Sequence, residues 1–177
     1  MQIHRYYLPS ENGAGSGWAE ILLTAGGMFA AVSDFGNYAY AWRHHGRDDV
    51  RKFFVREDAG NWDYFAHKLG GEHAEEYDPE RTLKNVKRVI LERRRRQTYS
   101  KDEAAKEWAL LVFHNDLEHA FDFSDWLRET RIEDAAAERR ERVGPMLERF
   151  CKETLQRLSR AIEAELALEA ASKAGAA

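Results

Sequence analysis

The chain has 177 residues, of which 44% are hydrophobic and 33% are charged, with a formal net charge of −4 at pH 7. Five Trp, seven Tyr and nine Phe are too many large apolar side chains for an intrinsically disordered protein, and three Pro exclude a Pro-rich chain. A chain of this length can bury enough surface to support one core. We therefore expect one folded domain, or one domain with an appendage.

The N-terminal residues lack the basic start and apolar core of a secretory signal. The longest uncharged stretch of the first half, residues 21–33, is shorter than the about 20 residues of a membrane-spanning helix. Cys151 is the only cysteine and cannot form an internal disulfide, so its place in a helical pattern predicts a small buried side chain. These features predict a soluble protein of a reducing cytoplasm without a membrane partner.

Residues 1–43 are rich in Gly, Ala and aromatic residues and predict an antiparallel sheet. Strand patterns cover residues 3–8, 18–24, 28–33 and 38–42. The short connections between the last three require antiparallel neighbours, so we expect a meander of three or four strands. Tyr38, Tyr40 and Trp42 recur with a period of two and are expected on one face of it.

Residues 44–170 carry charged residues and Ala at helical spacing and predict a helical body packed on the sheet. Helix-start signals occur at Asn61, at Asp78-Pro79 and at Ser100, which has Glu103 three positions later. Further helices are predicted over residues 48–57, over 132–142 and, as a long C-terminal helix, after Gly144-Pro145. The fold class is therefore α+β, with sheet and helices in one domain and a frayed tail over residues 171–177.

The charges are arranged in two opposite blocks. Residues 81–97 hold eight basic side chains, including Arg93, Arg94, Arg95 and Arg96, against Glu92 alone. Residues 116–138 hold eight acidic side chains against Arg128 and Arg131. A basic helix end can contact phosphates, which suggests a nucleic-acid site, but it can equally favour its own helix dipole or pair with the acidic block. Both interpretations remain open.

No known catalytic motif is present, so we expect no catalytic residues and no cofactor. Gly-x-Ser-x-Gly and a Gly-Lys-Ser/Thr phosphate loop are both absent. His114, Glu118 and Asp122 recur every four residues, and a continuous helix would place them on one face. A small metal-dependent hydrolase built on His114 and Glu118 is the remote alternative, whereas the solvent side of an amphipathic helix is the ordinary interpretation.

The segment Ser33–Trp42 combines a turn with alternating aromatic residues. We favour a structural role, in which a turn at Gly36-Asn37 precedes aromatics that pack the sheet, over a partner-binding role for Asp34, Tyr38 and Tyr40. Together with residues 17–20, 51–54 and 63–69, this segment resembles a family of small phage and prophage proteins. The resemblance covers about residues 17–110 and implies expression inside an infected or lysogenic bacterium, but it implies no catalytic residues.

The resemblance suggests a non-enzymatic accessory protein that binds a bacterial host protein or nucleoprotein complex and inhibits or modulates it. Phage proteins of this kind include antagonists of CRISPR-type defence effectors. Arg93, Arg94, Arg95, Arg96, Asp34, Tyr38 and Tyr40 are the candidate partner-binding residues. The alternative is a nucleic-acid-binding protein that uses Arg93–Arg96, and the C-terminal helix is a candidate for pairing with a second copy.

Overall fold

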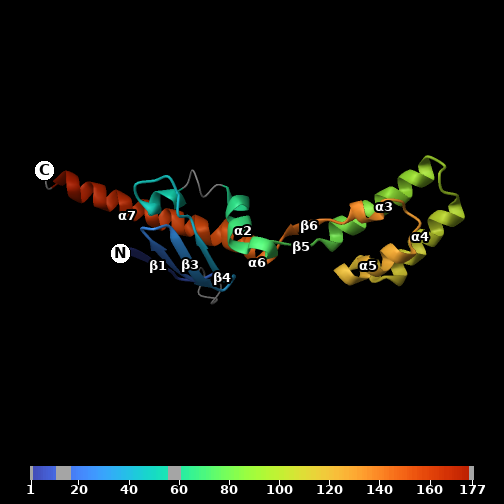
Figure 1. Ribbon diagram of the computed structural model, residues 1–177, viewed down its shortest axis with the longest axis horizontal. Helices are drawn as coiled ribbons and strands as arrows, with labels where there is room; N and C mark the ends of the chain where they lie inside the picture. Colours follow the sequence, from blue (N-terminus) through green and yellow to red (C-terminus); the bar gives the residue numbers. More distant parts are fainter. Residues whose placement is uncertain (1, 11–16, 56–60, 176–177) are drawn as a thin grey trace. The chain divides into compact units, whose positions relative to one another are not determined.

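The computed structural model describes residues 2–10, 17–55 and 61–175. They form two compact units: unit 1 comprises residues 1–75 and 143–177, and unit 2 comprises residues 76–142 (Figure 1). The chain passes between the units through strands β5 (Glu75–Tyr77) and β6 (Glu141–Val143), which pair with each other. This division differs from the one-domain arrangement expected from the sequence, because each unit has a separate cluster of buried apolar side chains.

Unit 1 is built on a four-stranded antiparallel sheet. Its strands are β1 (Ile3–Leu8), β2 (Ala19–Thr24), β3 (Met28–Ser33) and β4 (Gly36–Ala41), and each pairs with the next in sequence. This confirms the predicted meander and the α+β class. β4 begins two residues before the predicted strand because Ser33 and Gly36 already pair across the turn.

The turn between β2 and β3 requires a glycine. Gly27 has a φ of +84°, in the left-handed region that residues with a Cβ avoid. A Cβ on Gly27 would also lie 2.1 Å from the carbonyl oxygen of Trp42. The Gly27 carbonyl accepts a hydrogen bond from the Trp42 amide at 2.8 Å, so the end of β4 lies directly against this turn.

Helices cover one face of the sheet. They are the 3₁₀ turns η2 (Val50–Phe54) and η3 (Gly71–His73), the helix α2 (Trp62–Gly70), and a C-terminal helical stretch. That stretch consists of α6 (Pro145–Arg149), a π-helical turn η6 (Phe150–Thr154) and α7 (Leu155–Gly175), which confirms the long C-terminal helix. α7 continues past residue 170, where the sequence predicts fraying, and residues 176–177 lie outside the described residues.

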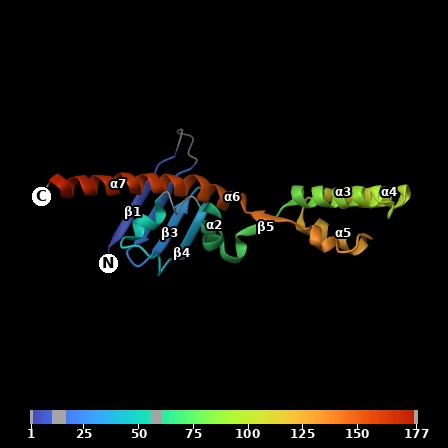
Figure 2. The same cartoon turned by 90° about the horizontal axis from the view of Figure 1, so that it is seen from above.

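The core of unit 1 lies between the sheet and these helices. α7 runs alongside the strands in both views (Figures 1 and 2). Leu155, Leu158 and Ile162 of α7 are fully buried in one cluster with the inward-facing residues of the strands. Phe29, Trp42 and Phe54 form an aromatic group with ring centroids 5.4–5.9 Å apart. Cys151 is completely buried, as its helical setting predicts.

Unit 2 is helical. It contains α3 (Pro79–Arg95), α4 (Lys101–Phe113), η4 (Asn115–Leu117), α5 (Ala120–Glu129) and η5 (Ala135–Glu138). The predicted caps are confirmed: the Asp78 carboxylate accepts from the Arg81 amide, and Ser100 forms a capping box with Glu103. The helix predicted over residues 132–142 is wrong, because that segment is a short 3₁₀ turn followed by β6.

The described residues include no helix that is both long enough and apolar enough to cross a membrane.

Candidate interaction surfaces

The basic run lies at the C-terminal end of α3, in unit 2. Arg93 is held within the unit: its guanidinium donates to the carbonyl oxygen of Glu133 at 3.3 Å and lies 5.3 Å from the centre of the Tyr99 ring. Arg94, Arg95 and Arg96 are exposed, and their side chains form no hydrogen bond or ion pair with any residue that the structure describes. The structure therefore separates one structural arginine from three that face solvent.

The acidic and basic blocks pair only in part. Lys87 lies 3.7 Å from Asp116, and Arg88 lies 3.6 Å from Glu138. Lys84, one turn before Arg88, is exposed and unpaired within the described part of unit 2. The cations in the middle of α3 thus form ion pairs within unit 2, whereas Lys84 and the arginines at its C-terminal end remain available to bind another molecule.

A shallow furrow runs along the exposed side of α3. Its apolar lining comes from Leu83 and Leu91, and its charged lining from Glu80, Lys84, Lys87, Arg88, Glu92 and Arg95. Leu91 is 45% exposed, which is unusual for a large apolar side chain in the middle of a helix. The furrow is therefore mixed in character, with apolar and acidic groups among the cations.

Asp34, Tyr38 and Tyr40 belong to the turn between β3 and β4 and to the covered face of β4. The Asp34 carboxylate accepts a hydrogen bond from the Trp18 amide at 3.1 Å, and the Tyr38 hydroxyl donates to the Phe35 carbonyl at 2.6 Å. Tyr40 is half-buried, with its ring centre 4.7 Å from that of Trp42. These contacts hold all three side chains within unit 1. The turn itself lies at Asp34-Phe35, and Gly36 and Asn37 already pair with β3 as the first residues of β4, so the predicted position of the turn at Gly36-Asn37 is wrong.

The predicted alignment of His114, Glu118 and Asp122 on one helix is wrong. α4 ends at Phe113, and the backbone then takes positive φ values at Asn115, Asp116 and Leu117 before α5 begins. The buried Asp122 carboxylate instead caps α5 by accepting from the His119 amide at 2.9 Å. No group of three or more His, Cys, Asp or Glu suited to a metal occurs among the described residues.

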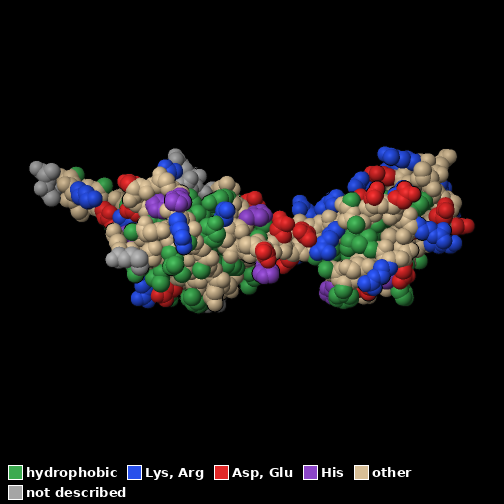
Figure 3. Space-filling view, in the orientation of Figure 1, with side chains coloured by type: hydrophobic (Ala, Val, Ile, Leu, Met, Phe, Trp, Pro, Cys, Tyr) green, Lys and Arg blue, Asp and Glu red, His purple; other side chains and the backbone are tan. Residues whose placement is uncertain are grey.

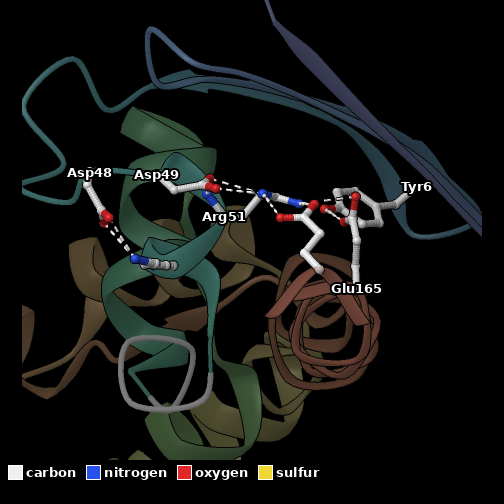
Figure 4. Close-up of polar contacts among 7 residues, drawn as sticks. Tyr6, Asp48, Asp49, Arg51 and Glu165 are labelled. Atoms are coloured by element: carbon white, nitrogen blue, oxygen red, sulfur yellow. Dashed lines mark hydrogen bonds and ion pairs between the residues drawn. The ribbon is translucent and has the colours of Figure 1, made fainter. Parts of the chain in front are cut away.

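A buried arginine forms the most extensive polar cluster of unit 1 (Figure 4). The Arg51 side chain is only 5% exposed, and its guanidinium binds Asp49 at 2.7 Å, Glu169 at 2.6 Å and Glu165 at 3.1 Å. The Tyr6 hydroxyl donates to the other oxygen of Glu165 at 2.5 Å. The cluster therefore ties η2 and β1 to α7.

The electrostatics of this cluster are those of a structural clamp. Hydrogen bonds from Arg51 lower the pKa values of Asp49 and Glu169, and the two carboxylates raise the pKa of Arg51 in return. Burial, together with Glu165, raises the pKa of Tyr6. These shifts favour ionised Asp49 and Glu169 and protonated Arg51, which is the charge pattern of a structural ion-pair cluster.

The sheet face turned away from α7, which we call the outer face, is largely apolar. Strand register places on it Ile3, Arg5, Tyr7, Glu20, Leu22, Thr24, Met28, Ala30, Val32, Asn37, Ala39 and Ala41. The large apolar members are between 40% and 65% exposed. Hydrophobic side chains are visible on the surface of unit 1 in Figure 3. No described element of unit 1 covers this face.

Sequence reasoning missed both the Arg51 cluster and the outer face. Arg51 carries no local signal, because its three carboxylate partners include two on α7, more than a hundred positions away. The outer face did have a signal, since Ile21-Leu22-Leu23 and Met28–Val32 are continuous apolar runs rather than alternating ones. Such runs are typical of strands buried on both faces.

The chain matches a known protein family over most of its length. Residues 1–164 match the sequence model of a family described as a phage family. The match extends well beyond the segment of about residues 17–110 that carries the resemblance noted above, and it includes all of unit 2. No curated protein and no solved structure matches the chain.

Proposed function

We propose that the chain, which belongs to this phage family, is a non-enzymatic accessory protein that binds a bacterial host complex and inhibits or modulates it. The observation that carries the proposal is the exposed side of α3, where Lys84 and Arg94–Arg96 have no partner among the described residues. Cations that the fold does not use can steer and orient a partner of opposite charge.

The lining of the furrow favours a protein surface within that partner. Leu83 and Leu91 supply apolar area between the cations, and Glu80 and Glu92 place negative charge in the same furrow. Protein interfaces combine apolar and charged groups in this way, whereas a nucleic-acid backbone selects continuous positive charge. A CRISPR-type defence effector, which presents both protein and nucleic acid, is the host complex that we propose to test first.

The test is phage plating on a bacterial host with active CRISPR immunity, with and without expression of the full chain. We expect expression to restore plaques, and the tagged chain to co-purify with the effector from the same cells. The variant Arg94→Gln/Arg95→Gln/Arg96→Gln should lose both effects. A control with the same charge change on other parts of unit 2, Lys101→Gln/Lys106→Gln/Arg128→Gln, should keep both.

Two results would contradict the proposal. One is an unchanged plaque count together with no effector in the purified fraction. The other is equal loss of both effects in the arginine variant and in the matched control, because the effect would then follow net charge alone and not the α3 surface.

A second candidate function, nucleic-acid binding, rests on the same three arginines. Three phosphate contacts would make the logarithm of the binding constant fall with the logarithm of salt concentration with a slope of up to about −3. Fluorescence anisotropy with labelled duplex and single strands, between about 50 and 200 mM salt, measures that slope. The arginine variant should flatten it, and an absence of binding at the lowest salt would rule this function out.

A further inference from the structure

The strands of unit 1 have the composition of a sheet that is covered on both faces. β2 and β3 carry apolar residues at successive positions, which is typical of strands with both faces buried. An antiparallel sheet with one solvated face normally alternates apolar and polar residues instead. The inner face is covered by α7, whereas no described residue covers the outer face.

The exposed apolar area approaches what a stable interface needs. Ile3 is 55% exposed, Tyr7 65%, Leu22 40%, Met28 56% and Val32 51%. Residues of this size expose on the order of 150–200 Å² when fully accessible, so these fractions leave about 400–500 Å² of exposed surface, most of it apolar. A standard interface takes about 800 Å² from each partner, and the alanines and polar rim of the outer face supply the rest.

The charges of the outer face suit an identical partner. Its only charged residues are Arg5 and Glu20, which pair at 2.7 Å across β1 and β2. The face is therefore neutral, and two copies can approach without repulsion and exchange these charges across a two-fold axis. The α3 surface, in contrast, carries unpaired cations and would repel a second copy of itself.

The outer face also has a hollow that a side chain of the partner can enter. A shallow groove is lined by Glu20, Leu22, Ala30, Val32, Asn37 and Ala39 among others. The small Ala30 and Ala39 pair across β3 and β4 within this groove, whereas Ile3, Tyr7 and Met28 of the same face are more than half exposed. An exposed large side chain of a second copy can therefore pack into the groove.

We propose that a second copy of this chain covers the outer face, so that two sheets pack face to face about 10 Å apart. The alternative dimer through the C-terminal helix has less exposed apolar surface available, because Leu155, Leu158 and Ile162 are buried in the core of their own unit. Leu168 is the exposed large apolar side chain on α7. The dimer carries two copies of unit 2, so a host complex with repeated binding sites is bound with higher avidity.

Sedimentation equilibrium of the full chain between about 1 and 100 µM tests the proposal, and we expect the mass of a dimer at the higher concentrations. Leu22→Lys and Val32→Lys place charge in the centre of the interface, and each should give a monomer with an unchanged circular dichroism spectrum. Leu168→Lys makes the same exchange on α7 and should remain a dimer. A monomeric wild type, or a monomer caused by Leu168→Lys alone, would overturn the proposal.

A charge exchange gives an independent test. Arg5→Glu makes the outer face doubly negative and Glu20→Arg makes it doubly positive, so each variant alone should be monomeric. An equimolar mixture should form a mixed dimer, which native mass spectrometry identifies by its mass. Failure of the mixture to associate, with both variants folded, would show that the outer face is not the interface. Because these measurements require no host component, their failure is distinguishable from failure of the proposed function.

Discussion

Replacing Arg51 by methionine tests whether the buried clamp stabilises unit 1. The change keeps an apolar stem of similar length, but it removes the hydrogen bonds to Asp49 and Glu169. Breaking a buried ion pair by removal of one partner costs about 3–5 kcal/mol. The carboxylate side chains here are 24–42% exposed and can regain water, so we expect a loss of about 2–3 kcal/mol in the free energy of unfolding.

Urea unfolding followed by far-UV circular dichroism measures this loss. With a denaturant slope of about 1–3 kcal/mol per molar, the midpoint of the transition of unit 1 should fall by about 0.7–3 M. Hydrogen exchange read by mass spectrometry should assign the lost protection to the described residues of unit 1, which are 2–10, 17–55, 61–75 and 143–175, and leave unit 2 unchanged. Lys52→Met is the matched control, because Lys52 pairs only with the exposed Asp48 and its loss should leave the midpoint close to that of the wild type.

Two results would refute the reasoning. If Arg51→Met unfolds at the same urea concentration as Lys52→Met, the Arg51 guanidinium contributes no more to the free energy of unfolding than an exposed lysine does. If protection is lost equally in both units, the change acts through something other than the cluster that ties η2 to α7.

Three further predictions concern unit 1. Gly27→Ala should lower the free energy of unfolding by about 3 kcal/mol in urea, because the strain of a left-handed backbone adds to the collision with the Trp42 carbonyl. Gly46→Ala is the control, because a Cβ there has no atom within 4 Å and only the backbone strain remains. Equal losses in the two variants would be inconsistent with the collision. Because the pKa of Asp49 is lowered in the folded chain, its ionised carboxylate stabilises the fold fully at pH values above the ordinary carboxyl pKa. That stabilisation is lost as the pH falls through the lowered pKa. At pH values below about 4, the urea concentration at the midpoint should therefore decrease, and it should decrease more steeply in the wild type than in Arg51→Met. Parallel curves for the two proteins would show that the Asp49–Arg51 pair does not cause the pH dependence. Burial raises the pKa of Cys151 to about 12, so an aromatic disulfide reagent should react with it only after unfolding, and rapid reaction of the native chain would contradict its burial.

Local signals in the sequence were sufficient for the elements that depend on near neighbours. The strands over residues 3–8 and 28–33 have the predicted bounds, since period, turn glycines and β-branched or aromatic residues act within a few positions. The helix starts at Asn61, Asp78 and Ser100 are confirmed for the same reason: a side-chain oxygen caps an amide two or three residues away.

Longer segments were decided by tertiary contacts. The apolar spacing typical of a helix continues from α4 into α5, but the backbone has positive φ values over residues 115–117 and the helix stops there. This turn places the Leu117 side chain in the core of unit 2, where it is fully buried, so packing overrides the local pattern. Among the candidate site residues, the basic run is evident from the sequence. That Arg93 donates to the Glu133 carbonyl and lies over the Tyr99 ring, while Arg94–Arg96 face solvent, is evident only from the structure. That distinction depends on residues brought together from separate elements of unit 2.

Spacing along the chain is enough to predict the α+β class, the order of the strands, the helix caps and the two charge blocks. The division into two units, the burial of Arg51 among three carboxylates and the uncovered face of the sheet depend instead on contacts that form only when the chain folds. Those features join residues far apart in sequence, such as Arg51 and Glu169, and no local period or propensity encodes such a contact.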